Sequence, residues 1–195
     1  MVSLRERNRT NAKVLVQRTG LALFYEHGFD EVTVGRIADA AGMAASSVYR
    51  HFPTKEDIVL WDEHDEAIDE ALTRQLKKLP PLQAMRTVFV ETLGHRYDAD
   101  IEFQLQRIKY IYATEQIHAA AIEADLRNRI ELSDGLRHAL GRKNRDAAPI
   151  LAGAALLAVD VAVERWQAND ANKPLSVYLN GAFDALTTMA TIGLS

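Results

Sequence analysis

The feature that most constrains this chain is a pair of short helical patterns separated by one glycine, between residues 33 and 52. Thr33 is a good N-cap for the first pattern, because its hydroxyl can accept a hydrogen bond from a backbone N–H of the first turn. The second pattern ends on Val48 and Phe52, an apolar pair four residues apart. Gly42 lies between them, where a residue without Cβ can adopt a left-handed conformation without strain. The spacing predicts two short helices that meet at a sharp turn.

The start of the second pattern consists of small residues, which favours a role in reading DNA. A helix that enters the major groove with its N-terminal end needs little bulk there, and hydroxyls can bond to base edges and phosphates. We expect base-edge contacts from Arg36, Ala45, Ser46 and Ser47. We expect contacts to the DNA backbone from Thr33, Tyr49, His51 and Lys55.

The distribution of charge supports the same interpretation. Residues 1–18 carry five basic side chains and one acidic side chain, although the formal net charge of the whole chain is -4. A basic end on an acidic protein is typical of a surface that binds the phosphate backbone. Each of these side chains alone has an ordinary structural explanation, and their combination with the glycine turn carries the prediction.

The segment from Phe24 to Lys55 resembles the N-terminal DNA-binding signature of the TetR family of bacterial transcriptional repressors. The positions that carry the resemblance are Phe24, Gly28, Phe29, Thr33, Val34, Ile37, Ala38, Ala41, Gly42, Ser47, Tyr49, His51, Phe52 and Lys55. Ser46 stands where the family often has Gly, and Ala45 where it often has Lys or another polar residue, which affects the expected operator sequence. The resemblance implies a repressor that binds a double-stranded DNA operator as a homodimer and is released by a ligand.

Helical periodicity continues along the rest of the chain, and no segment shows sustained two-residue alternation. We therefore expect an all-α fold with nine helices of TetR-like architecture. The expected helices cover residues 10–27, 33–41, 44–52, 55–79, 82–96, 100–113, 117–140, 146–168 and 174 onward. We expect a DNA-binding domain over residues 1–54 and a larger ligand-binding and dimerisation domain over residues 55–195.

The last two expected helices are unusually rich in small and apolar residues. Two such helices at the end of one subunit favour a four-helix bundle shared across a twofold axis. The alternative is that both helices merely close the core of one protomer. We expect a homodimer through the eighth and ninth helices, and two reading heads related by a twofold axis require one.

The helices between the fourth and the eighth are expected to hold a regulatory ligand. The candidate lining of an apolar pocket is Trp61, Met85, Phe89, Phe103 and Tyr110. Ordinary core packing is the alternative for each of them. Residues 136–166 resemble the corresponding part of family members that sense acyl-CoA or similar lipophilic molecules, which implies a small hydrophobic effector such as an acyl-CoA or a fatty acid.

Several other classes of protein lack support in the sequence. The chain contains no cysteine, so it cannot build a thiolate zinc site. Glu115 and His118 form one E-x-x-H pair, whereas di-iron bundles need two such pairs. Hydrolase, metalloprotease and phosphate-loop motifs are missing. We therefore expect no enzyme, no cofactor and no metal.

The location of the protein is predicted from its apolar segments. The uncharged apolar stretch 147–159 is shorter than the roughly 18 to 20 residues of a membrane span. The polar, basic N-terminus carries no secretory signal. We expect a soluble, cytoplasmic protein without a membrane partner. The alternative to a DNA-binding regulator is a helical ligand-binding or enzymatic protein that has lost its DNA role, or a module that regulates through another protein.

Overall fold

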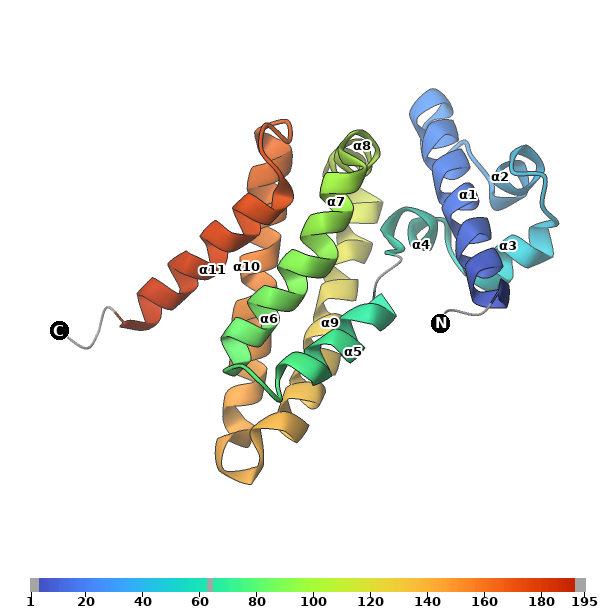
Figure 1. Ribbon diagram of the computed structural model, residues 1–195. Coiled ribbons are helices and arrows are strands. Elements are labelled where there is room, and N and C mark those ends of the chain that lie inside the picture. Colours follow the sequence, from blue (N-terminus) through green and yellow to red (C-terminus); the bar gives the residue numbers. More distant parts are fainter. Residues whose placement is uncertain (1–3, 63–64, 192–195) are drawn as a thin grey trace. The chain divides into compact units, whose positions relative to one another are not determined.

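The computed structural model describes residues 4–62 and 65–191, and these residues form helices and loops without a β-strand (Figure 1). The α-helices are α1 Leu4–His27, α2 Val34–Ala40, α3 Ala45–His51, α4 Lys55–Leu60, α5 Asp65–Gln75, α6 Pro81–Phe89, α7 His95–Ala99, α8 Ile101–Ala113, α9 Glu115–Leu140, α10 Ala148–Ala168 and α11 Leu175–Thr191. A π-helical segment, Val90–Gly94, joins α6 to α7, and a 3-10 helix, Arg142–Ala147, precedes α10. The expected all-α fold is confirmed.

The chain divides into two compact units. Unit 1 comprises Met1–Glu63 and Tyr110–Ala121, and unit 2 comprises His64–Lys109 and Ile122–Ser195. Helices α8 and α9 therefore each contribute residues to both units. The functional division after residue 54 stays a prediction.

Unit 1 is organised around one apolar core. Phe24 of α1, Ile37 of α2, Val48 of α3 and Ile58 of α4 are all almost completely buried. The crossing of α1 and α4 is close, because a Cβ added at Gly20 would lie 3.0 Å from the Ile58 side chain. These contacts fix α2 and α3 on the scaffold of α1 and α4.

The prediction of a single helix over residues 55–79 is wrong, because the structure has two helices there, α4 and α5. A capping box formed by Thr54 and Asp57 starts α4. The helix nevertheless ends at Leu60, and Trp61 leaves it with backbone angles of φ -54° and ψ 128°. The buried Gln17 Nε2 donates to the carbonyls of Ile58 (3.0 Å) and Trp61 (2.8 Å). Gln17 thus satisfies carbonyl groups that a helix end leaves without partners.

The other expected helices are present with shifted ends. The helix expected over residues 82–96 runs through α6, the π-helical segment and α7, and ends at Ala99. The helix expected over residues 146–168 begins as the 3-10 helix and continues as α10. Glycines in left-handed conformations follow α1 and α9, with φ angles of 84° at Gly28 and 68° at Gly141. Both glycines end helices, because a residue without Cβ adopts this conformation without strain.

Helices α10 and α11 pack side by side in unit 2 (Figure 1). The small residues of α10 that face the core are Ala148, Ala152, Ala155, Ala158 and Ala162. From α11, Leu175, Leu179, Ala182 and Phe183 are buried as well. Most of the apolar residues that suggested a dimer thus pack within the protomer. Asp98 of α7 accepts hydrogen bonds from Leu175 N (2.6 Å) and Ser176 Oγ (2.8 Å), which holds the start of α11.

Within residues 4–62 and 65–191, one helix, Arg145–Ala168, is long and apolar enough to cross a membrane by length and composition alone. The stretch counted in the sequence is shorter because it stops before the first charged residue, Asp160. Core helices of soluble proteins meet the same criterion. The alanine face of this helix packs on α11, as a core helix does.

Candidate nucleic-acid interface

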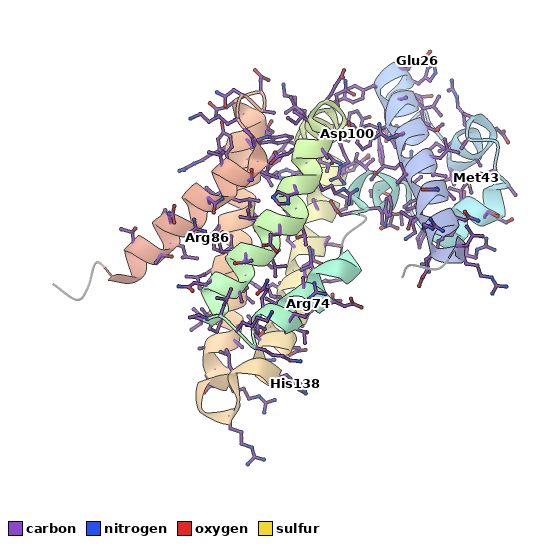
Figure 2. All side chains as sticks on the ribbon, in the orientation of Figure 1. Glu26, Met43, Arg74, Arg86, Asp100 and His138 are labelled. Atoms are coloured by element: carbon purple, nitrogen blue, oxygen red, sulfur yellow. The ribbon has the colours of Figure 1, made fainter. Side chains whose placement is uncertain are left out.

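The turn between α2 and α3 has the geometry that the sequence predicts. The Thr33 hydroxyl accepts a hydrogen bond from Arg36 N at 3.2 Å, so Thr33 is the N-cap of α2. Gly42 has a φ angle of 66°, and Met43 N donates to Ala38 O at 2.9 Å. Met43 lies in this turn between the two helices (Figure 2). This glycine and this hydrogen bond fix the sharp turn between α2 and α3.

Exposure separates the residues of α2 and α3 that hold the fold from those that can meet DNA. Ile37, Ala38 and Val48 are fully buried and anchor the two helices. Ser47 and His51 are half-buried. The exposed candidates are Thr33, Arg36, Ala45, Ser46 and Tyr49. Five of the predicted contact residues are thus open to solvent beside the two helices.

A shallow groove brings three of the predicted backbone contacts together. Thr33, Tyr49 and Lys55 line it, and its volume is about 370 Å³. Val32, Val34, Pro53, Thr54 and Glu56 complete the lining. The groove combines hydroxyl groups with an ammonium group, which are donors suited to phosphate oxygens.

Lys55 has a structural role beside its predicted role in DNA binding. Its Nζ donates to Phe29 O at 2.7 Å and lies 4.5 Å from the centre of the Phe29 ring. These contacts join the start of α4 to the loop after α1. The charge remains beside the groove, so a phosphate contact and a structural role are compatible.

His51 lies in a cluster of positive charge that includes the basic first helix. Burial lowers the pKa of His51 below its ordinary value of 6.5, and the charges of Arg50, Lys13 and Arg9 lower it further. Lys13 Nζ also lies 5.1 Å from the centre of the Trp61 ring. The basic N-terminal residues therefore lie near the end of α3, and together they form an electropositive surface.

The sequence predicted a basic N-terminal segment, and the structure shows that Arg9 and Lys13 of this segment lie near His51. Their four-residue spacing on α1 places them on one helix face. That spacing was a usable signal, but the sequence did not show that this face lies near His51.

The candidate ligand residues are divided between the two units. Trp61 and Tyr110 belong to unit 1, whereas Met85, Phe89 and Phe103 belong to unit 2. Trp61 contacts the Phe52 ring edge-on at 6.0 Å, and Phe89 stacks on Phe183 at 6.3 Å. Met85 is fully buried and Phe103 is half-buried. The five-residue pocket stays a prediction.

Tyr110 packs against the end of α1. Its ring centre lies 4.8 Å from that of Tyr25, and its hydroxyl donates to Phe24 O at 3.2 Å. Burial raises the pKa of Tyr110 above its ordinary value of 10.0. Tyr110 also lines an open pocket of about 380 Å³ with Phe29, Asp30, Ala113, Thr114, Glu115 and Gln116. This lining is largely polar and does not match the expected apolar pocket.

The fold and this interface define an all-helical protein with an N-terminal helix-turn-helix unit. Residues 18–60 match the profile of the tetR family of bacterial regulatory proteins, and residues 79–191 match the profile described as the MftR C-terminal domain of TetR proteins. The chain belongs to the TetR family of bacterial regulatory proteins.

Curated relatives are similar to part of the chain. The transcriptional regulator TcmR of Streptomyces glaucescens is 35% identical over 103 residues, which are 51% of this chain and 45% of the relative. The probable acrEF/envCD operon repressor of Escherichia coli K12 is 32% identical over 114 residues, 53% of this chain and 50% of the relative. The chain spans about half the length of these relatives. Both relatives are named as regulators of transcription and neither is named as an enzyme.

Solved structures share the fold over nearly the whole chain. The repressor FadR of Thermus thermophilus in complex with lauroyl-CoA has a TM-score of 0.54 and 21% identity, covering 90% of this chain and 93% of FadR. NalD of Pseudomonas aeruginosa, a repressor of a multidrug efflux pump, has a TM-score of 0.56 and 17% identity, covering 93% and 96%. At these identities the likeness establishes the fold alone.

Proposed function

We propose that this chain is a ligand-responsive, DNA-binding transcriptional regulator that acts as a repressor in the bacterial cytoplasm. The observation that carries the proposal is the α2–α3 pair, which presents exposed small and polar residues beside a basic surface while its apolar face is buried. This arrangement suits insertion of α3 into the major groove. The proposal includes no enzymatic step.

The proposed contacts divide between base reading and positioning. Arg36, Ala45, Ser46 and Ser47 meet base edges, and Arg36 is the only charged group among them. Thr33, Tyr49, His51 and Lys55 meet the DNA backbone. Because the base-reading edge is small, affinity depends largely on phosphate contacts and on the basic residues of α1.

The proposed homodimer forms through α10 and α11, the eighth and ninth expected helices. Their buried faces are occupied within the protomer, so the dimer contact must use other residues. Ile150 and Leu157 of α10 and Val177 of α11 are 73%, 62% and 49% exposed. Large apolar side chains exposed on neighbouring helices are suited to contact with a second copy.

The proposed effector is a small hydrophobic molecule such as a fatty acid or an acyl-CoA. Support comes from the fold shared with the FadR complex that contains lauroyl-CoA. The ligand favours a state whose reading heads no longer fit successive major grooves, so ligand and DNA oppose each other reciprocally.

The test is a gel-shift assay with the DNA upstream of the protein's own gene, together with sedimentation at micromolar concentration. We expect a salt-sensitive complex and a dimeric mass. Matched variants are Ser47→Ala on the predicted reading edge and Thr73→Ala on an exposed position of α5. Absence of a complex with every upstream fragment would favour the alternative, a helical ligand-binding or enzymatic protein that has lost its DNA role.

A further inference from the structure

The middle of α9 in unit 2 carries an apolar stripe that is open to solvent in the protomer. Ile122, Leu126 and Ile130 repeat every four residues and are 60%, 50% and 55% exposed. The described stretch from Ile122 to Glu131 buries no side chain. Leucine and isoleucine are among the residues most often buried, and several of them together on one exposed face mark a site of contact with another molecule. We call these three residues the α9 stripe.

The charged residues around the α9 stripe have opposite signs on the two sides of Leu126. Glu123 and Asp125 precede Leu126 by three residues and by one residue. Arg127 and Arg129 follow it by one residue and by three residues. The two isoleucines of the stripe lie four residues before and four residues after the same leucine. The stretch thus consists of an acidic half and a basic half that are centred on one apolar side chain.

These charged side chains are accessible to a second molecule. All four of them are exposed in the protomer. Arg127 Nη1 lies 3.9 Å from Glu123 Oε2, and the two side chains are 65% and 79% exposed. An exposed pair of this kind adds little to the stability of a single helix. Both groups therefore remain open to a partner that offers the opposite charge.

We infer that a second copy of this chain covers the α9 stripe, with the two α9 helices crossing antiparallel at Leu126. Antiparallel pairing lays the acidic half of each helix over the basic half of the other, so the charges are complementary across the contact. Parallel pairing would place each carboxylate beside its own copy. A twofold contact uses the same ridge of side chains on both helices, and ridges of four-residue spacing are those that pack together most often in globular proteins.

The chemistry of this stretch disfavours other occupants. From Ile122 to Ile130 it carries two carboxylates and two guanidinium groups, so it has no net charge. DNA and anionic lipid surfaces attract an excess of basic groups, which this stretch does not have. A small apolar ligand binds in a concave pocket, and both pockets described above lie in unit 1. A second copy matches the apolar and the charged parts of the stretch together.

The α9 stripe adjoins the side of α10 that is proposed above to meet a second copy. Arg129 Cδ lies 3.6 Å from the position of a Cβ added at Gly153, so the stem of Arg129 packs over α10 there. Ile150 and Leu157 are exposed and lie about one turn before and one turn after Gly153. One twofold contact can therefore include the middle of α9 and the outer side of α10. The inference rests on the proposed function only in taking the chain to be a homodimer.

The first experiment follows the sedimentation of the full chain across the micromolar range in two charge-reversed variants. Glu123→Lys with Asp125→Lys makes the whole stretch basic, and Arg127→Glu with Arg129→Glu makes it acidic. We expect each double variant alone to self-associate at least about tenfold more weakly than the natural chain, because like charges then meet across the contact. An equimolar mixture of the two variants should recover the dimeric mass, which also shows that both variants fold.

The matched control reverses two exposed charges elsewhere in unit 2. Lys77→Glu with Lys78→Glu lies between α5 and α6 and should leave self-association unchanged. A dimer whose affinity is the same in both α9 variants as in the natural chain would overturn the inference. A natural chain that stays monomeric across the micromolar range would do so too. Two α9 variants that keep their helical circular dichroism and do not associate when mixed would overturn it as well.

The second experiment tests where the two helices cross, and it does not depend on the folding of the charge-reversed variants. The chain contains no cysteine, so Leu126→Cys introduces a single thiol at the proposed crossing point. A disulfide requires a Cα separation of roughly 4.4 to 6.8 Å, which two facing residues at a helix crossing can meet. Oxidised glutathione should link two Leu126→Cys chains far faster than two Thr73→Cys chains, which carry the thiol on an exposed position of α5. Equal rates of linking in the two variants would overturn the inference.

The α9 contact and the proposed function are tested separately. The gel shift measures DNA binding, whereas sedimentation and disulfide linking measure the α9 contact without DNA. An α9 contact in a chain that binds no upstream fragment would support the inference and refute the proposed function. A chain that binds DNA as a dimer, with a mass and affinity that the α9 variants do not change, would support the proposed function and refute the inference.

Discussion

The two compact units differ in whether their buried polar side chains all have hydrogen-bond partners. In unit 1, the buried amide of Gln17 donates to the carbonyls that end α4. Among the described residues, the buried side-chain atoms without a partner are Ser133 Oγ and Trp166 Nε1, and both lie in unit 2. Gln17 of unit 1 is thus satisfied, whereas two buried side-chain atoms of unit 2 have no hydrogen-bond partner.

The exposed aliphatic side chains are distributed differently in the two units. Helices α1 to α4 of unit 1 share one buried core, although α1 exposes Leu4 and Leu15. In unit 2, the middle of α9 exposes three large aliphatic side chains and buries none. A rigid scaffold suits a surface that must match DNA, and an exposed helix stretch that buries no side chain suits a unit that must change shape with a ligand. The predictions below test this difference, beginning with the largest expected effect.

The first comparison uses the same substitution in each unit. Ile37→Ala removes a fully buried side chain of α2 and should cost about 2–5 kcal/mol of unfolding free energy. Ile122→Ala removes a side chain of α9 that is 60% exposed in the protomer and should change the stability of the monomer by less than about 0.5 kcal/mol. Urea denaturation followed by circular dichroism measures both, at a protein concentration where the chain is monomeric. A large loss for Ile122→Ala there would show that another part of the same chain covers α9 in solution.

The second prediction concerns what the rigid scaffold presents to DNA. Arg36→Ala removes the charged candidate for base reading and should cost about 1–3 kcal/mol of binding free energy on the preferred operator. Its effect on unrelated DNA should be small. Tyr49→Phe removes a hydroxyl from the groove and should weaken binding to all sequences alike. Competition gel shifts with operator and random DNA distinguish the two patterns, and a uniform loss in Arg36→Ala would reassign Arg36 to the backbone.

The third prediction asks whether Lys55 both stabilises the fold of unit 1 and binds a DNA phosphate. Lys55→Ala removes the contacts with Phe29 and should lower stability by about 1 kcal/mol. It should also reduce the slope of log affinity against log salt by about 0.9, the value for one phosphate contact. Lys55→Met keeps most of the apolar stem and serves as the control for packing. An unchanged salt slope together with lower stability would leave Lys55 with a structural role alone.

The sequence predicted unit 1 better than unit 2 because the determinants of unit 1 are local. Thr33 as a cap and Gly42 as a turn act within a few residues, and the structure confirms both. The end of α4 was missed because it depends on Gln17, more than forty residues away in the chain. The buried contacts of Tyr97 in α7 with Arg107 of α8 and with Trp166 of α10 likewise depend on three helices packing together. Periodicity shows which face is apolar, but it does not show which polar residues a core will enclose.

His51 allows the electropositive surface of unit 1 to be tested by pH. Its pKa in the free protein is lowered by burial and by neighbouring cations, so the side chain is neutral at pH 7. A DNA phosphate favours the imidazolium and raises the pKa of His51, so DNA binding takes up a proton. Affinity should therefore rise by about two- to fivefold between pH 8 and pH 6. The rise should disappear in His51→Gln, and its persistence there would place the titrating group elsewhere.

The smallest expected effect comes from unit 2, where Asp160 of α10 lies near Asp125 of α9. Burial, and then the charge of Asp125, raises the pKa of Asp160 from 3.8 to about 6. The folded state therefore binds the proton more tightly than the unfolded state does. The stability gained from protonation is full below pH 3.8, is lost as the pH rises toward 6, and does not change further above pH 6.

Asp160→Asn mimics the protonated form, so it should stabilise the protein above pH 6 and leave it unchanged near pH 3.8. The gain should stay below about 1 kcal/mol, because the side chain is partly exposed and solvent screens it. Thermal melts at pH 4 and pH 7.5 measure the difference, with Glu164→Gln as an exposed control on the same helix. Asp160 shares the outer side of α10 with Leu157, which is proposed to meet a second copy. A gain that grows with protein concentration would therefore place the carboxylate at the dimer contact, and a gain independent of concentration would confine it to the protomer.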